Sequence, residues 1–502
     1  MKFLLRFAAC FLILGALALP TRADTPEQAK KLTNADLFTE FTGFESLDTL
    51  YDENETRGVH AVSPASMTMH AEEGIGSLYI RFGAMCDEYT VTDPDTGASK
   101  TLPHQFFHDF VDLETTLGYI PKTVTLSFPS GSVTIDSIAV YSPGQVPDSV
   151  QRWTMPGEGQ TDLLLFSTHG DDEHLFFAGV LPYYATELGY QVQVVYLSDH
   201  RIEKSSTRMR EMLDGLWAVG IRTYPISGMF PDFRIDAKRQ TYERFEMLGY
   251  TQEDLVEFVV EQIRRFEPKV VLGHDFAGEY GHGQHQVYAE VLSIALEISM
   301  DPEQYPLSAE AYGTWDVPKA YFHLYEENPI VMDWDQPLES FDGMTAFEAS
   351  IQVGFQQHKS QIEYFDWYYA YAENAAGVRR FNPCYYGLYR STVGEDMQKN
   401  DFFENVTTYA QDAELEAQRL AEEEAARIAA EEEAAKKAAE EAAQKAAEEA
   451  ARLAAEEEAA RIAAEQAAAQ QKKTVIIGIS CALGLFFLIF VIILFRKKFL
   501  KK

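Results

Sequence analysis

The sequence predicts an α/β protein whose main domain has a Rossmann-like, mostly parallel sheet. A β-sandwich domain precedes it, and a helical stalk and one transmembrane helix follow it. Three observations lead to this prediction. Residues 24–155 hold short alternating apolar runs, residues 156–400 alternate apolar runs with helical periods, and residues 401–502 turn from charged to apolar. At 502 residues the chain is longer than one ordinary domain, which agrees with this division.

Residues 1–23 have the order of parts typical of a secretory signal peptide. Lys2 and Arg6 precede an apolar run from Phe7 to Leu19, and the small residue Ala23 ends the segment. We therefore expect the chain from residue 24 onward to be exported.

Residues 24–155 are expected to form the β-sandwich domain. Four runs alternate apolar and polar residues and are separated by Gly, Pro and Asp: GSLYIRFGA, YTVTD, KTVTLSFPSG and VTIDSIAVYSPG. Such alternation indicates strands that bury one face. Because no long helical period lies between the runs, a small two-sheet sandwich is predicted.

Residues 156–400 are expected to form the α/β domain. Three continuous apolar runs read as buried strands: DLLLFST, YQVQVVYLS and KVVLG. Helical stretches follow them, among them RMREMLDGLWAVGI, DLVEFVVEQIRRFEP and HQVYAEVLSIALEI. Strands that are apolar throughout and alternate with helices are typical of a mostly parallel sheet covered on both faces.

Residues 401–471 are expected to form a charged, Ala/Glu-rich helical stalk. Between residues 412 and 470 there is no Gly or Pro, and Glu repeatedly precedes Lys or Arg by four residues, as in Glu433 and Lys437. Large apolar residues are sparse and keep no steady heptad, so a single charged helix is favoured over a coiled coil. A loose Ala-lined oligomer stays open, and the oligomeric state is not assigned.

Residues 474–495 are uncharged and apolar, and they are long enough to cross a hydrocarbon layer of ~30 Å. Residues 496–502 form a basic tail that contains five Lys or Arg. The positive-inside tendency places this tail in the cytoplasm and residues 24–471 outside the cell. The prediction is a single-pass protein of the cell membrane.

The charge of the chain excludes one large class of partners. The formal net charge is −36, which argues against binding nucleic acid through its phosphates. Only Cys86 and Cys384 lie between the signal peptide and the apolar run, so no disulfide framework is predicted.

Two dense polar clusters follow predicted strands. The first, THGDDEH, brings His169, Asp171 and Asp172 directly after DLLLFS; the second, HDFAGEYGHGQH, ends in His282 and His285 and follows KVVLG. Ligands of open α/β sheets bind at the carboxyl ends of strands, so the two clusters can meet in one cleft.

Imidazole and carboxylate are good zinc ligands, and catalytic zinc keeps three protein ligands and one open position. His169, Asp172 and His285 are therefore expected to bind one zinc ion. Asp171 would stand beside the ion as a general base, and His282, taken as a cation, could stabilise an oxyanion or protonate a leaving amine. A lone HxxH or DDE run is weak, but the joint pattern indicates a metal site.

THGDDEHLFFAG and GEYGHGQH resemble the two signature stretches of the PIG-L/LmbE family of zinc-dependent N-acetylglucosaminide de-N-acetylases. The resemblance covers roughly residues 158–395, with further matches at RMRE, FPD, KAYFHLY and HKSQ. It implies zinc binding and deacetylation, with the same ligands and base as above. It also implies that Tyr280 is a mobile active-site tyrosine and that Arg208 and Asp232 contact substrate. For Arg208, a structural pair with Glu211 is an equal alternative.

One departure from the family pattern concerns Gly170, which stands where the family usually has Pro. Gly loosens the loop, but no ligand or base is lost, so activity is expected to survive.

The sequence therefore predicts a cell-surface zinc-dependent hydrolase that removes the acetyl group from an N-acetylated amino sugar in a GlcNAc-type glycan or glycoconjugate. The alternative is a surface adhesin or glycan-binding protein with an inactive deacetylase-like domain. Hydrolysis of a different amide, such as a thiol conjugate of an amino sugar, would use the same chemistry.

Overall fold

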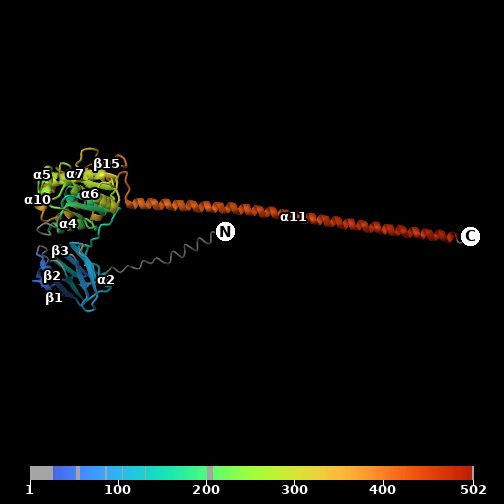
Figure 1. The fold of residues 1–502 in the computed structure, drawn as a ribbon, viewed down its shortest axis with the longest axis horizontal. Coiled ribbons are helices and arrows are strands. Elements are labelled where there is room, and N and C mark those ends of the chain that lie inside the picture. Colours follow the sequence, from blue (N-terminus) through green and yellow to red (C-terminus); the bar gives the residue numbers. More distant parts are fainter. Residues whose placement is uncertain are drawn as a thin grey trace. The chain divides into compact units, whose positions relative to one another are not determined.

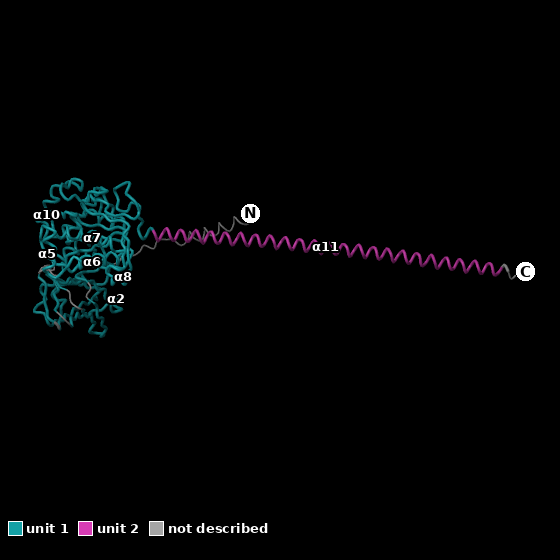
Figure 2. Tube along the Cα trace, turned by 45° about the horizontal axis from the view of Figure 1, so that its top comes forward, with its two compact units in different colours: residues 1–411 teal, residues 412–502 magenta. Residues whose placement is uncertain are grey.

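The structure is a computed structural model that describes residues 27–52, 57–84, 88–103, 106–129, 132–200 and 207–499 (Figure 1). It divides into two compact units, Met1–Gln411 and Asp412–Lys502 (Figure 2). The predicted signal peptide, Cys86 and the basic residues of the tail after residue 499 lie outside the described residues.

The N-terminal region contains one eight-stranded antiparallel sheet with the order β5-β4-β7-β2-β8-β3-β6, and β1 pairs with β2. The strands are β1 (Phe38–Phe44), β2 (Val59–His70), β3 (Ser77–Ala84), β4 (Glu88–Thr92), β5 (Ser99–Pro103), β6 (His108–Asp112), β7 (Thr123–Phe128) and β8 (Ser132–Tyr141). One short helix, α2 (Leu113–Leu117), follows β6.

The long strand β2 joins two groups of strands. Its first half, Val59–Val62, pairs with β8, and its second half, Ala65–His70, pairs with β7. Residues from both groups, such as Ile80 of β3 and Val91 of β4, are fully buried in one apolar core. The hydrogen-bonded ladders run through β2 and connect all eight strands in one path. The β-sandwich architecture stays a prediction.

The second sheet has seven strands in the order β11-β10-β9-β12-β13-β15-β14. Its strands are β9 (Leu163–Ser167), β10 (Val192–Ser198), β11 (Ile226–Phe230), β12 (Val270–Gly273), β13 (Lys319–His323), β14 (Pro329–Val331) and β15 (Tyr385–Ser391). The strands from β11 to β13 are parallel, and β15 and β14 add an antiparallel edge. The predicted mixed α/β class is confirmed.

Helices cover both faces of this sheet. They are α3 (Asp172–Leu175), α4 (Thr207–Ala218), α5 (Lys238–Met247), α6 (Gln252–Phe266), α7 (Gly283–Ile298), α8 (Pro306–Tyr312), α9 (Ala346–Glu348) and α10 (Ile362–Tyr369). Successive residues of β9 enter opposite cores: Leu163 and Leu165 pack with α4, whereas Leu164 packs with α6 and α7. This explains why the predicted strands are apolar at every position rather than at alternate ones.

Local signals set the helix ends. In α6 the Oγ1 of Thr251 accepts from the Asp254 amide at 3.2 Å, and Asp254 Oδ2 accepts from the Thr251 amide at 2.7 Å. This reciprocal pair satisfies amide groups that the first turn leaves open. The helix ends at Glu267, whose φ of 46° breaks the helical path.

The C-terminal part of the chain is one continuous helix, α11 (Tyr409–Phe499), through the predicted stalk and the apolar run. Most of its side chains between residues 409 and 497 are exposed, and the predicted pair Glu433 and Lys437 lies at 2.8 Å. Within Tyr409–Lys497, an 18-residue window reaches a mean hydropathy of 3.0. By length and composition, this helix could cross a membrane.

Candidate metal centre and active-site pocket

The two polar clusters meet at the carboxyl ends of neighbouring parallel strands. β9 and β12 pair directly. His169 and Asp171 lie in the turn that leaves β9, and Asp172 is the first residue of α3. After β12 the chain passes through the short helix η4 (Glu279–Gly281) into α7, where His282 is the N-cap and His285 lies in the first turn.

Three atoms form a tight triangle in this place. His169 Nδ1 lies 3.1 Å from Asp172 Oδ2 and 3.1 Å from His285 Nε2, and the last two atoms are also 3.1 Å apart. Tetrahedral zinc ligands about 2.1 Å from the ion lie roughly 3.4 Å from one another, so these atoms fit the ion. The second oxygen of Asp172, Oδ1, is buried and has no hydrogen-bond partner among the described residues.

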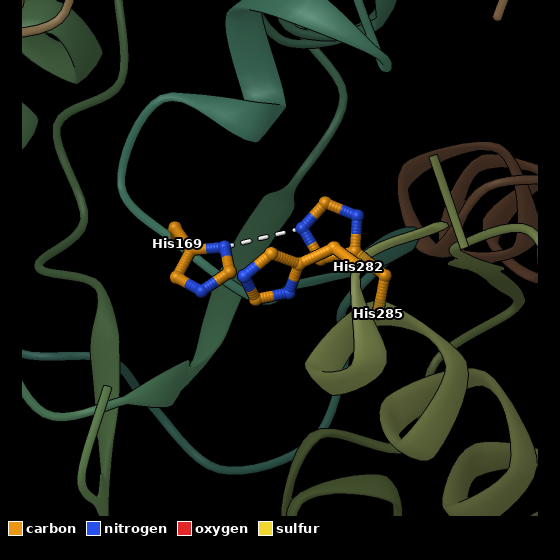
Figure 3. A group of neighbouring side chains, drawn as sticks. All are labelled: His169, His282 and His285. Atoms are coloured by element: carbon orange, nitrogen blue, oxygen red, sulfur yellow. Dashed lines mark hydrogen bonds between the residues drawn. The ribbon is translucent and has the colours of Figure 1, made fainter. Parts of the chain in front are cut away.

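His282 offers a different ligand combination with His169 and His285 (Figure 3). Its Nδ1 accepts from the Gln284 amide at 3.3 Å, so Nε2 carries the proton of a neutral ring. Burial, together with His169 and His285, lowers the pKa of His282 to about 2. The geometry therefore favours a neutral His282 that donates a hydrogen bond, rather than the cation considered from the sequence.

His274 also lies close to the candidate ligands, but both of its ring nitrogens already make hydrogen bonds. Its Nε2 accepts from the Thr168 amide at 3.0 Å and its Nδ1 donates to Glu279 at 2.9 Å. Because both of its ring nitrogens are in hydrogen bonds, His274 stabilises the neighbouring residues of the site.

Glu279 connects the buried histidines. Its carboxylate accepts from Nδ1 of His285 at 2.7 Å, from Nδ1 of His274 at 2.9 Å and from Nδ1 of His323 at 2.7 Å. Burial alone would raise the pKa of Glu279, but the histidines hold it well below its usual range. The bond to His285 leaves Nε2 of that ring as the free acceptor that a metal requires. The sequence interpretation missed this role, although Glu279 lies in the quoted GEYGHGQH stretch.

Asp232 makes an equivalent contact with the other histidine. Its Oδ1 lies 3.2 Å from His169 Nε2. Burial opposes ionisation of Asp232, yet its interaction with His169 holds its pKa below the usual range. Asp232 therefore orients His169 and also lines the pocket, where the sequence predicted a substrate contact.

Asp171 and Arg208 form an ion pair at the pocket wall, with 3.2 Å between Oδ2 and Nη1. Glu211, the alternative partner for Arg208, instead accepts from the Ser360 amide at 2.8 Å and from its hydroxyl at 2.6 Å. Asp171 is outside the triangle of candidate ligands but lines the same pocket, which is the position of a group that acts on a reacting molecule.

Tyr280 has a strained backbone, with φ 47° and ψ 20°. Its ring lies 5.5 Å from the rings of His282 and His285 and 6.0 Å from that of Phe365. Burial raises the pKa of Tyr280 well above its usual value, so the hydroxyl keeps its proton. Left-handed non-glycine residues cost free energy and concentrate at functional sites.

The contacts of Gly170 explain why glycine fits where the family usually has proline. Its amide donates to His200 Nε2 at 2.8 Å, a bond that a proline could not make. A Cβ at this position would also lie 2.9 Å from Cβ of Met212. The loop is therefore held by a hydrogen bond and by close packing instead of by a proline ring.

A third group with metal-binding side chains, Glu173, His174 and His358, lies behind the site and is fully buried. None of these residues lines the pocket.

The pocket in front of the triangle has a volume of about 500 Å³, within the range of about 300–1,000 Å³ that is usual for small-molecule sites. One half is polar: His169, Asp171, Arg208, Asp232, Arg234, Tyr280 and His282. The other residues are Phe233, Gln361, Tyr364, Phe365 and Trp367, mostly from α10.

Comparison with known proteins finds a family similar to the part of the chain that holds these residues. Residues 164–296, from β9 to α7, match the family described as PIG-L, GlcNAc-PI de-N-acetylase. The matched stretch contains His169, Asp172 and His285. The PIG-L/LmbE resemblance stated from the sequence is confirmed.

Individual relatives have related names. The chain is 23% identical to the 1D-myo-inositol 2-acetamido-2-deoxy-alpha-D-glucopyranoside deacetylase 1 of Catenulispora acidiphila, over 49% of this chain and 83% of that protein. It is 30% identical to a deacetylase of the same description, numbered 2, from Saccharopolyspora erythraea, over 31% of this chain and 54% of the relative. A solved N,N'-diacetylchitobiose deacetylase of Pyrococcus horikoshii aligns at 15% identity over 44% of this chain and 81% of its own, with a TM-score of 0.31.

Proposed function

We propose that this chain, which carries a PIG-L domain in residues 164–296, is a zinc-dependent hydrolase that removes the acetyl group from an N-acetylated amino sugar. The observation that carries the proposal is the triangle of His169, Asp172 and His285 atoms, 3.1 Å apart, beside a pocket with a carboxylate that is not part of it. The names of the relatives support a GlcNAc-type substrate.

The proposed ligands are His169, Asp172 and His285. When bound, a zinc ion supplies Lewis acidity, which polarises a carbonyl group and makes water more acidic. Asp232 and Glu279 orient the two histidines from the opposite ring nitrogens, at 3.2 Å and 2.7 Å.

Asp171 is the proposed general base. Its carboxylate is held by Arg208 at 3.2 Å and lines the pocket, so it can accept the proton of the attacking water. The amide carbon becomes tetrahedral and its oxygen gains negative charge. His282, through Nε2–H, and the hydroxyl of Tyr280 are proposed to donate hydrogen bonds to that oxygen. The C–N bond then breaks, the proton taken by Asp171 passes to the leaving amine, and the acetyl group departs as acetate.

The proposed location is the outer face of a cell membrane, with α11 as a single membrane span. The uncharged run at residues 474–495 supports the span, and the basic residues after it favour a cytoplasmic tail. The body, proposed as a β-rich domain at residues 24–155 and a deacetylase domain at residues 156–400, would then act on external glycans.

The decisive experiment measures zinc and acetate with the full chain purified in detergent. We expect about one zinc per chain after dialysis and acetate release from N-acetylglucosaminides. Asp171→Asn should keep the zinc and lose about 10²–10⁴-fold in kcat, because it removes the base without removing a ligand. Asp172→Ala should lose the zinc.

A chain that binds no zinc and releases no acetate would contradict the enzyme proposal and favour the glycan-binding alternative. An Asp171→Asn variant with full rate would contradict the base assignment alone.

A further inference from the structure

α10 and the turn that follows it carry three exposed aromatic side chains, two of which line the pocket. Tyr364 is 69% exposed, Trp367 38% and Tyr371, in the turn after the helix, 87%. Tyr364 and Trp367 are three residues apart in α10, which places them on the same side of the helix, and both line the pocket. Among the described residues only one other Tyr or Trp, Tyr385, is exposed, so these rings are concentrated here.

The other side of α10 is fixed to the catalytic domain. The Tyr368 hydroxyl lies 2.7 Å from the Phe381 carbonyl and 3.1 Å from the Leu175 carbonyl. Phe365 packs against Tyr280, with 6.0 Å between ring centroids. The two exposed rings on α10 therefore stand on an element that is anchored beside the reactive groups.

A second hollow shares one lining residue, Trp367, with the pocket. It has a volume of about 230 Å³ and is lined by Trp367, Tyr371, Arg379 and Arg380, among others. Trp367 lines both hollows, so the two lie on either side of, or beside, this one residue. The Arg380 guanidinium carbon lies 5.6 Å from the centre of that ring.

These groups match the chemistry of a sugar chain. One face of a pyranose ring is made of C–H groups and stacks on Tyr or Trp, while its hydroxyl and acetamido oxygens accept hydrogen bonds from arginine. Rigid aromatic rings give large contact area at low entropic cost. A single sugar would occupy the catalytic pocket without reaching Tyr371 and Arg379 in the second hollow.

We propose that the catalytic pocket continues across Trp367 as an extended binding site for a chain of N-acetylated amino sugars. The substrate class is then an oligosaccharide or polysaccharide rather than a single sugar or a small inositol conjugate. The inference rests on the proposed function, because it extends the same pocket.

Binding is tested separately from turnover. The full chain carrying Asp171→Asn is titrated by calorimetry with N-acetylglucosamine and with its β-1,4-linked tetramer. We expect the tetramer to bind at least about tenfold more tightly, and Tyr371→Ala to remove about tenfold of that preference. Tyr385→Ala, the exposed tyrosine outside this group, is the matched control and should keep the ratio.

Equal affinity for both sugars, a lack of binding by either, or a ratio that Tyr371→Ala leaves intact would each overturn the extended site. Acetate release by the chain without Asp171→Asn separates the two proposals. Tight, Tyr371-dependent binding of the tetramer without acetate release would retain the extended site and reject the hydrolase. Acetate release without any preference for the tetramer would retain the hydrolase and reject the extended site.

Discussion

Glu279 illustrates how one buried residue can determine the state of several others. Its single carboxylate faces three imidazole Nδ1 atoms, of His285, His274 and His323, at 2.7–2.9 Å. A buried carboxylate is costly without such partners, and here the carboxylate in turn fixes the proton of each ring on Nδ1. The proposed metal ligand His285 therefore depends on a residue that would not touch the metal.

Glu279→Gln should weaken zinc affinity by about 10–100-fold, because His285 loses the anionic partner that orients its ring. Competition with a chromogenic chelator measures this affinity, and circular dichroism confirms folding. Glu290→Gln is the matched control: Glu290 lies on the same helix, α7, and accepts from Lys238 at 3.0 Å, away from the pocket. Equal zinc affinity in all three proteins would argue against the orienting role.

Asp109, in β6, gives the N-terminal sheet a pH dependence. Burial raises its pKa to about 6, although the Tyr89 hydroxyl donates to it at 2.8 Å. In the unfolded chain its pKa is about 4, so between these values the folded state binds a proton that the unfolded state releases. The contribution of protonated Asp109 to the free energy of unfolding is therefore fully present below about pH 4. It is lost as the pH rises through about 6.

Asp109→Asn should remove this loss, because the amide stays uncharged and its oxygen can still accept from Tyr89. At pH 8 the variant should gain about 3 kcal/mol over the parent, with little difference at pH 4. Thermal unfolding of both proteins at the two pH values measures the gap. If the difference in stability between the variant and the parent did not change with pH, the raised pKa of Asp109 would be contradicted.

The candidate site is positioned mainly by the ends of strands and helices. β9 and β12 carry no reactive side chains themselves, but because they are parallel neighbours their carboxyl ends deliver both polar clusters to one place. The first turn of α7 then sets the position of His285, and Gly283 allows that turn to approach the segment before α5 closely. The Gly283 amide donates to the Ile235 carbonyl at 2.7 Å.

Gly283→Ala should disturb the start of α7. A Cβ there would lie 2.6 Å from the Ile235 carbonyl oxygen, so the helix must shift. We expect a loss of about 1–3 kcal/mol in stability and weaker zinc binding, since His285 moves with the turn. Gly157→Ala is the control, because a Cβ at Gly157 meets no atom within 4 Å. Thermal unfolding and the chelator assay should separate the two variants.

At the scale of the whole molecule, the chain combines a compact body with a helix that makes up the second unit. The described part of that unit exposes most of its side chains along its length, both in the Ala/Glu-rich part and in the apolar run. Exposed large apolar residues such as Leu485 and Phe486 are unfavourable in water over so long a stretch. By length and composition the helix could cross a membrane, which would bury these side chains.

A chain that ends after residue 471 should therefore no longer fractionate with membranes, whereas the full chain should resist extraction with alkaline carbonate. Internal deletion of residues 430–450, within the charged stretch, is the control and should leave membrane association unchanged. Membrane retention of the shortened chain would show that another region anchors the protein.

Short-range patterns were sufficient to predict much of this protein. The apolar runs gave β9, β10 and β12, because a strand buried on both faces leaves a continuous apolar signature. The spacing within THGDDEH and GEYGHGQH, together with the PIG-L/LmbE resemblance, pointed to His169, Asp172 and His285. The apolar window after residue 473 is likewise a local property of composition.

Other features depend on contacts between distant residues, and only the tertiary structure decided them. His323 reaches Glu279 because β13 lies beside β12, Asp232 reaches His169 from a different loop, and Tyr368 anchors α10 to Leu175, 193 positions earlier in the chain. The continuity of the N-terminal sheet through β2 has the same origin. Periodicity reports which side of an element is buried, but not which element buries it, so the partners of each side chain emerge only from the packed fold.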